Sequence, residues 1–184
     1  MKKTLLASLA TAALAVTSLA AQAQKDPTVG GAEMYPTKTI VENAVNSPIH
    51  KTLVAAVKAG GLVDTLNSPG PFTVFAPTDD AFAKLPAGTV DTLVKPENKE
   101  TLDKILTYHV VPGRISSKQL EAMIKKGGGK TMLKTVQGED LTFTMSGNKI
   151  MLTDAKGGMA VITTADVYQS NGVIDVIDTV LMPS

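Results

Sequence analysis

Cysteine and tryptophan are both absent from this sequence, and its aromatic side chains are limited to four phenylalanines and three tyrosines. Without cysteine no disulfide can cross-link the fold, so packing alone must hold it together. With so few aromatic residues, the core must be built mainly from Val, Leu, Ile, Ala and Met. A chain of 184 residues is long enough to bury such a core as one domain.

Clustered positive charge is also missing. The chain carries 18 Lys and Arg residues against 17 Asp and Glu residues, and Arg114 is its single arginine. Nucleic acids and anionic lipids are bound by basic side chains that lie close together. The scattered and nearly balanced charges therefore argue against both kinds of partner.

Residues 1–23 have the pattern of an export signal. Lys2 and Lys3 give a basic start, an apolar run follows from Leu5 to Ala20, and Ala21-Gln22-Ala23 is a small-x-small cleavage pattern. The run is shorter than the ~20 residues that a membrane span needs, and no basic flank follows it. We therefore expect cleavage after Ala23, no transmembrane segment in the mature protein, and a secreted or periplasmic location.

The rest of the chain changes character at Gly127-Gly128-Gly129. Residues 24–36 contain several Pro and Gly and are expected to form a loose N-terminal arm, followed by a single domain over residues 37–184. Before the three glycines, apolar residues recur at helical spacing. After them, short alternating segments separated by turns indicate strands. This order predicts an α+β fold in which one sheet packs on segregated helices.

Turn and capping residues set the expected element boundaries. An apolar helical stripe begins at Lys38 and ends at Asn46, and Ser47-Pro48 is expected to begin a second helix that Gly60-Gly61 closes. The turn Ser146-Gly147-Asn148 predicts a hairpin between two of the later strands. Further short helices are expected over 79–84, 88–94, 96–106 and 116–124, and strands over 72–76, 108–112, 131–136, 141–145, 149–152, 160–167 and 173–182.

The most informative segment runs from Phe72 to Phe82. It begins as an alternating strand, Pro77 ends the hydrogen-bonded ladder, and Thr78 or Asp79 can cap the helix that follows. We expect at least Phe72 and Phe82 to be core residues. The two faces of the strand carry Phe72, Val74 and Ala76 on one side and Thr73 and Phe75 on the other.

The patterns that would indicate catalysis or metal binding are weak. His50 and His109 are the only histidines and have no metal-binding spacing; we expect His50 to be solvated and His109 to be a buried, hydrogen-bonded structural residue. Asp79-Asp80 is more typical of a helix start than of a glycosidase pair. Gly129-Lys130-Thr131 lacks the opening glycine of a phosphate-binding loop and follows a helix. We therefore expect no enzyme, no metal and no cofactor.

Three segments resemble the motifs of the fasciclin domain family. Phe72–Phe82 resembles its first motif, Tyr108-His109-Val110-Val111-Pro112 its central tyrosine–histidine motif, and Asn171–Pro183 its second motif. One departure is Asp175, where many members carry histidine. The motif residues expected to serve structure are Phe72, Phe75, Pro77, Thr78, Asp79, Phe82, Asn171, Gly172, Asp175 and Asp178.

The resemblance implies a β-wedge packed with a cluster of short helices, in a single-domain secreted bacterial protein. It also implies adhesion to a protein or cell-surface partner, with Tyr108 and His109 as binding residues; we expect a monomer. The alternative is a cell-envelope protein that binds a small apolar or carbohydrate ligand. A ligand binder should have an apolar pocket with convergent polar groups, whereas an adhesion module should have an exposed patch.

Export can be tested directly. Because the small-x-small pattern follows an uncharged apolar run, protein recovered from the periplasm or the culture medium should begin at Gln24. Intact-mass measurement decides this. A chain that still carries Met1 to Ala23 and is found in the membrane fraction would contradict the prediction.

Overall fold

The computed structural model describes residues 27–184, so the predicted signal and its cleavage site lie outside the described residues. The strands are β1 (Thr28–Val29), β2 (Ala32–Glu33), β3 (Phe72–Pro77), β4 (Val110–Pro112), β5 (Lys130–Lys134), β6 (Asp140–Ser146), β7 (Lys149–Thr153), β8 (Met159–Gln169) and β9 (Gly172–Ile177). The helices are α1 (Ile40–Asn46), α2 (Lys51–Gly60), α3 (Val63–Asn67), α4 (Asp79–Ala83), α5 (Thr89–Leu93), the 3₁₀ turn η1 (Pro96–Asn98), α6 (Lys99–Tyr108) and α7 (Ser117–Lys126).

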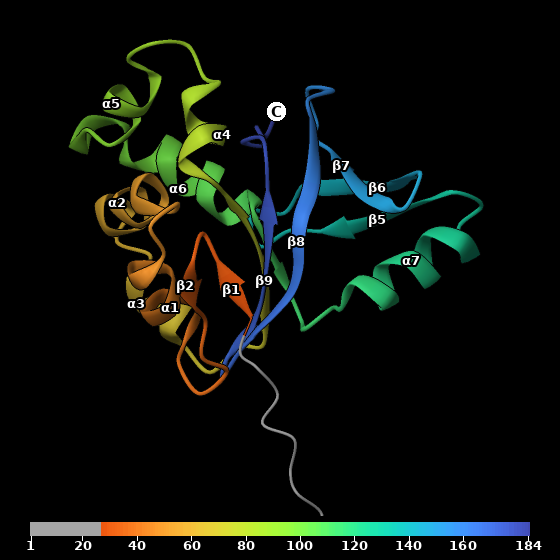
Figure 1. Ribbon diagram of the computed structural model, residues 1–184. Coiled ribbons are helices and arrows are strands. Elements are labelled where there is room, and N and C mark those ends of the chain that lie inside the picture. The colour runs from red at the N-terminus through yellow and green to blue at the C-terminus, as the bar shows by residue number, and fades with distance from the viewer. Residues whose placement is uncertain (1–26) are drawn as a thin grey trace, which may run out of the picture.

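Seven of the strands form one mixed sheet in the order β4-β3-β9-β8-β7-β6-β5. The pair β3–β9 is parallel and the other pairs are antiparallel. Helices α1 to α6 gather on one side of β3 and β9, whereas α7 lies beneath β5, β6 and β7 (Figure 1). The arrangement confirms the α+β prediction of one sheet packed with short helices.

The sheet curls far enough for its two ends to meet. The amide of Val136, just after β5, donates to the carbonyl of Val110 in β4 over 2.8 Å. A curled sheet has an inner face, which must be filled by side chains, and an outer face. The alternation of buried and partly exposed residues along β6 and β7 follows from this geometry.

Strands β3 and β9 separate two hydrophobic clusters. Val74 and Ala76 of β3 pack with the helices α1 to α6, and Phe75 packs on the opposite side with α7 and the inner face of β5 to β8. The predicted alternation along β3 is therefore confirmed. Val167, Ile174 and Val176 complete the first cluster from the sheet side, and Leu120 and Ile124 close the second from α7.

The phenylalanines of the first motif are not equally buried. Phe75 is fully buried and Phe82 is 8% exposed, so the prediction for Phe82 is confirmed. Phe72 is only half-buried, which corrects its assignment to the core. It occupies the first position of β3 and packs at the margin of the first cluster, where the chain has just left the loop before the strand.

Four boundary predictions were wrong. The strand predicted over 108–112 begins only at Val110, because Tyr108 is the last residue of α6. The described part of the predicted N-terminal arm, residues 27–36, is not loose: β1 and β2 form a hairpin, and Val29 and Met34 are buried in the first cluster. Ser47 ends α1 instead of beginning the next helix, which starts at Lys51. The last strand ends at Ile177 and not at Met182. Asp178 makes one more backbone bond to Val161, and the chain beyond it is held by side chains such as those of His109 and Asp154.

Candidate functional site

Tyr108 is the last residue of α6 and is fully buried. Its hydroxyl donates to the carbonyl of Asp140 over 3.2 Å and accepts from the amide of Ala155 over 3.0 Å. Burial raises the pKa of the phenol above its ordinary value. The neutral hydroxyl therefore joins the end of α6 to the start of β6 and to the turn between β7 and β8.

His109 caps the C-terminus of α6 and is also buried. Nδ1 lies 2.8 Å from the carbonyl of Ile105, and the amide of Leu181 donates to Nε2 over 3.0 Å. A carbonyl only accepts and an amide only donates, so this geometry fixes the neutral tautomer with the proton on Nδ1. Burial lowers the pKa of His109 to about 4. The expectation of a buried structural histidine is confirmed.

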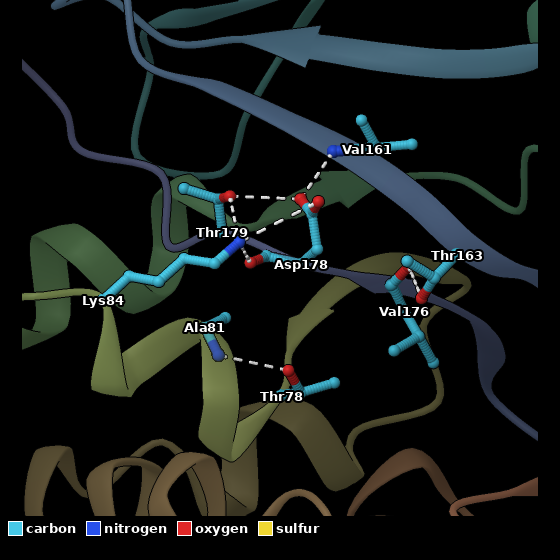
Figure 2. A network of polar contacts seen from close by, with 8 residues as sticks. All are labelled: Thr78, Ala81, Lys84, Val161, Thr163, Val176, Asp178 and Thr179. Atoms are coloured by element: carbon cyan, nitrogen blue, oxygen red, sulfur yellow. Dashed lines mark hydrogen bonds and ion pairs between the residues drawn. The ribbon is translucent and has the colours of Figure 1, made fainter.

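The chain after β9 is anchored through polar groups of other elements. Besides the bond to His109, the amide of Met182 donates to the Asp154 carboxylate over 2.9 Å. Figure 2 shows Asp178 accepting from the amide of Val161 over 2.9 Å, while the Lys84 ammonium donates to the Asp178 carbonyl over 2.6 Å. Asp178 thus ties the end of β9 to β8 and to α4, as expected of a structural motif residue.

Asn171 and Gly172 hold the start of β9. The Asn171 amide group donates to the carbonyls of Leu66 and Ser68 over 2.6 and 3.0 Å, and its oxygen accepts from the amide of Ile40 over 3.0 Å. A Cβ on Gly172 would lie 2.2 Å from the Phe72 carbonyl oxygen. Only glycine fits there, which explains this motif position.

Both residues proposed as caps for α4 serve as caps, but on different helices. The Thr78 hydroxyl accepts from the amide of Ala81 and caps α4, which Figure 2 shows. The Asp79 carboxylate instead accepts from the amide of Thr52 over 2.8 Å, at the N-terminus of α2. Asp79 therefore supplies the cap that Ser47 was predicted to give, because α2 begins beside β3 and not at Pro48.

His50 is the residue that sequence reasoning missed. It was expected to be solvated, but it is 3% exposed, because it precedes α2 on the side that faces the sheet. Its Nδ1 lies 2.7 Å from the Ser47 hydroxyl, and burial lowers its pKa. Within residues 27–184, Nε2 has no hydrogen-bond partner. Ser47 and His50 resemble a nucleophile and its base, but both are buried away from any substrate.

A small cavity lies beside His50. It is bounded by α1, α2 and α3 on one side and by β3 on the other, and its wall is apolar. The volume of about 60 Å³ would hold several waters by size, but an apolar wall leaves such a cavity dry. It is well below the 300–1,000 Å³ typical of ligand pockets. Its chemistry is unsuited to a carbohydrate and suited to a short hydrocarbon group.

The outer face of the sheet carries two of the exposed large apolar side chains of residues 27–184. In one row across β5 to β8, Met132 pairs with Thr142, Thr142 with Thr153, and Thr153 with Met159. Met132 is 56% and Met159 is 59% exposed. The next row contains Lys130, Thr144, Met151 and Val161. We call these eight residues the outer face; α7 packs on the opposite side of the same strands.

The described residues offer little for catalysis. Among residues 27–184 no three His, Asp or Glu side chains lie close enough together to hold a metal ion. In the same part of the chain, no helix is long and apolar enough to cross a membrane. The two predicted binding residues, Tyr108 and His109, are brought together inside the fold, where a partner docking on the surface would not touch them.

The role of His109 predicts a pH dependence. The unfolded chain binds a proton at His109 near the ordinary pKa of 6.5, and the folded chain near 4. Its contribution to folding is therefore present above pH 6.5 and lost as the pH falls to 4, a loss of about 3 kcal/mol. His109→Ala should lower the melting temperature at pH 7 and flatten this acid-side loss. Thermal melts between pH 4 and 7 test both; an unchanged melt at pH 7 would refute the structural role.

Comparison with known proteins agrees with these features. The Fasciclin domain model matches residues 48–183. Protein sll1483 of Synechocystis is 47% identical over 92% of this chain and 95% of its own length. Immunogenic protein MPB70 of Mycobacterium bovis is 41% identical over 76% of this chain and 66% of its own length. A solved FAS1 domain pair from the insect cell adhesion molecule Fasciclin I shares the fold, with a TM-score of 0.69 and 21% identity over 79% of this chain and 51% of that chain. The protein belongs to the fasciclin domain family.

Proposed function

We propose that this protein is an exported, non-enzymatic interaction module that attaches to a protein or cell-surface partner. Three observations support the proposal. The export pattern of residues 1–23 would deliver the chain outside the cytoplasm. Fasciclin I is an insect cell adhesion molecule by description, and MPB83 of Mycobacterium bovis, 37% identical over 76% of this chain, is a cell surface glycolipoprotein. The histidines lack access to substrate.

We assign the partner contact to the outer face, because Tyr108 and His109 are buried and offer no contact surface. The two rows of this face consist of methionine, threonine and valine apart from Lys130 at the end of the second row, and the first row has an exposed methionine at each end. Methionine adapts its shape to a partner surface, and threonine hydroxyls can donate and accept hydrogen bonds. Exposed apolar side chains gathered on one face are typical of protein–protein contacts.

Replacing the two exposed methionines by lysine tests this assignment. Met132→Lys with Met159→Lys should weaken attachment to cells of the producing organism by tenfold or more, because two ammonium groups would have to be desolvated in the contact. The melting temperature should hardly change, since both positions are exposed. The matched control is Val45→Lys on α1, where Val45 is 51% exposed. Equal attachment by the double variant, the control and the wild type would rule out the outer face.

A second candidate is the binding of a small apolar ligand, favoured by the cavity beside His50. The exposed surface of the wall is hydrocarbon from three helices and from β3. Ser47 and His50 also line the cavity, but they present no polar surface to it that would orient a sugar. The cavity therefore supports the apolar form of this alternative and not the carbohydrate form. A ligand of this kind would place a short alkyl or ring group between α2 and the sheet.

A larger side chain in the cavity distinguishes binding of a small apolar ligand from attachment through the outer face. Val41 lines it and is only half-buried, so Val41→Phe can project added volume into the space with little strain. Benzene, used as the probe, should shift methyl resonances of lining residues in the wild type and not in this variant. The control is Val161→Phe, the same change at a half-buried position on the outer face. Identical shifts in all three proteins, or no shifts in the wild type, would contradict a ligand site.

A further inference from the structure

Asp175 is a buried carboxyl group in the middle of β9. It pairs in parallel register with Phe75 of β3 and has no exposed surface. Its Oδ1 accepts from the amide of Asp166 over 2.8 Å. Within residues 27–184, its Oδ2 has no hydrogen-bond partner. A charged carboxylate in this place leaves half of its hydrogen-bonding capacity unused, away from water.

Asp166 connects this group to the start of α7. It lies in β8 at φ 59°, within the irregular stretch between the Thr164 and Val167 pairings. Its carboxylate accepts from the amide of Ser117 over 2.7 Å and from the Ser117 hydroxyl. Ser117 is the first residue of α7, so Asp166 satisfies one of the free amides at that helix end. The strained backbone of Asp166 is itself secured by the bond to Asp175.

The charged groups around Asp175 do not favour its ionised form. From β8, the Asp166 carboxylate and the Tyr168 phenol face the same region, and Arg114 lies near Tyr168. The Arg114 guanidinium donates to the carbonyls of Gln169 and Ser170. Strand β3 presents the uncharged Thr73 and Phe75, and α7 presents Ser117. Burial raises the pKa of Asp175 to about 7. The hydrogen bond from the Asp166 amide lowers this pKa, and the charge of the Asp166 carboxylate raises it further.

We propose that Asp175, Asp166 and Ser117 form a pH-responsive latch that holds the N-terminus of α7 on the sheet while Asp175 is neutral and releases it when Asp175 is ionised. Ionisation places a second negative charge beside the Asp166 carboxylate in a region without a paired cation, and the repulsion between the two carboxylates weakens the bonds from Asp166 to Ser117. Release of this end of α7 loosens the packing of its own Leu120 and Ile124 on the second cluster. A rise in pH through neutrality thereby exposes apolar surface beneath α7.

The sign of the linkage follows from the two pKa values. Asp175 titrates near 3.8 in the unfolded chain and near 7 in the folded one. Its proton therefore stabilises the fold fully below pH 3.8, and this stabilisation is lost as the pH rises through 7. The contribution of His109 has the opposite sign but ends at pH 6.5. Measurements between pH 6.5 and 8.5 isolate Asp175.

The test compares Asp175→Asn with Asp178→Asn. Asparagine keeps an acceptor for the Asp166 amide but cannot ionise, and Asp178 is a matched control because it accepts from the β8 amide of Val161 over 2.9 Å. Hydrogen exchange of the full chain reports each amide. In the wild type and in Asp178→Asn, protection of the Ser117 and Asp166 amides, corrected for intrinsic rates, should fall tenfold or more from pH 6.5 to 8.5. In Asp175→Asn it should stay constant.

Carboxyl-carbon NMR of the wild type gives a second measurement that needs no variant. The Asp175 signal should titrate near pH 7, in step with the loss of Ser117 protection. Titration near the ordinary value of 3.8 would overturn the proposal. So would a pH dependence that Asp175→Asn retains. A third result would also overturn the proposal: global stability that changes with pH while the protection of the Ser117 amide does not. Asp175 would then be a buried acid that does not control α7.

Discussion

The parallel pairing of β3 with β9 is the contact on which the rest of the structure depends. It joins two segments about a hundred residues apart in the chain, so its formation fixes the whole topology. The pairing requires the close approach that Gly172 permits, and Asn171 holds α1 and the end of α3 at the same point. Both hydrophobic clusters are built against these two strands, one on each face. This fold has no disulfides and depends instead on one parallel strand pair that is buried on both faces.

Buried polar groups, and not the apolar residues around them, specify how the C-terminal segment closes this arrangement. After one backbone bond from Asp178 to Val161 the chain has no strand partner, and the amides of Leu181 and Met182 are satisfied by the buried His109 and Asp154. If one partner of such a bond is removed, the other is left buried without a hydrogen bond. The free-energy cost of that unsatisfied group is larger than the net stabilisation that the bond contributes. The tyrosine–histidine motif therefore behaves as an internal bridge: Tyr108 joins the β6 and β7–β8 regions to α6, and His109 joins the last segment to it.

Local patterns were sufficient for much of this fold. Alternation along 72–76 placed Phe75 and Val74 on opposite faces, and the turn at Gly147 predicted the β6–β7 hairpin, because both depend on near neighbours in sequence. His50 could not be placed this way. Its burial follows from where α2 begins, and that is decided by Asp79, which lies 27 residues from Thr52. The unusual state of Asp175 depends on Asp166 and on burial by β3, neither of which leaves a local signal.

The family motifs and the surfaces available for recognition are therefore separate parts of this molecule. Motif residues such as Asn171, Gly172 and His109 are occupied with internal contacts, so their presence reports the fold and not the partner. The outer face lies on strands β5 to β8, outside the three motif segments. The same strands carry α7 on their other side, where Asp166 holds Ser117. Partner contact on one side of these strands and release of α7 on the other would then act on a single layer of the sheet. A change in the position of α7 would reach the outer face through the strands that α7 contacts, which are β5, β6 and β7.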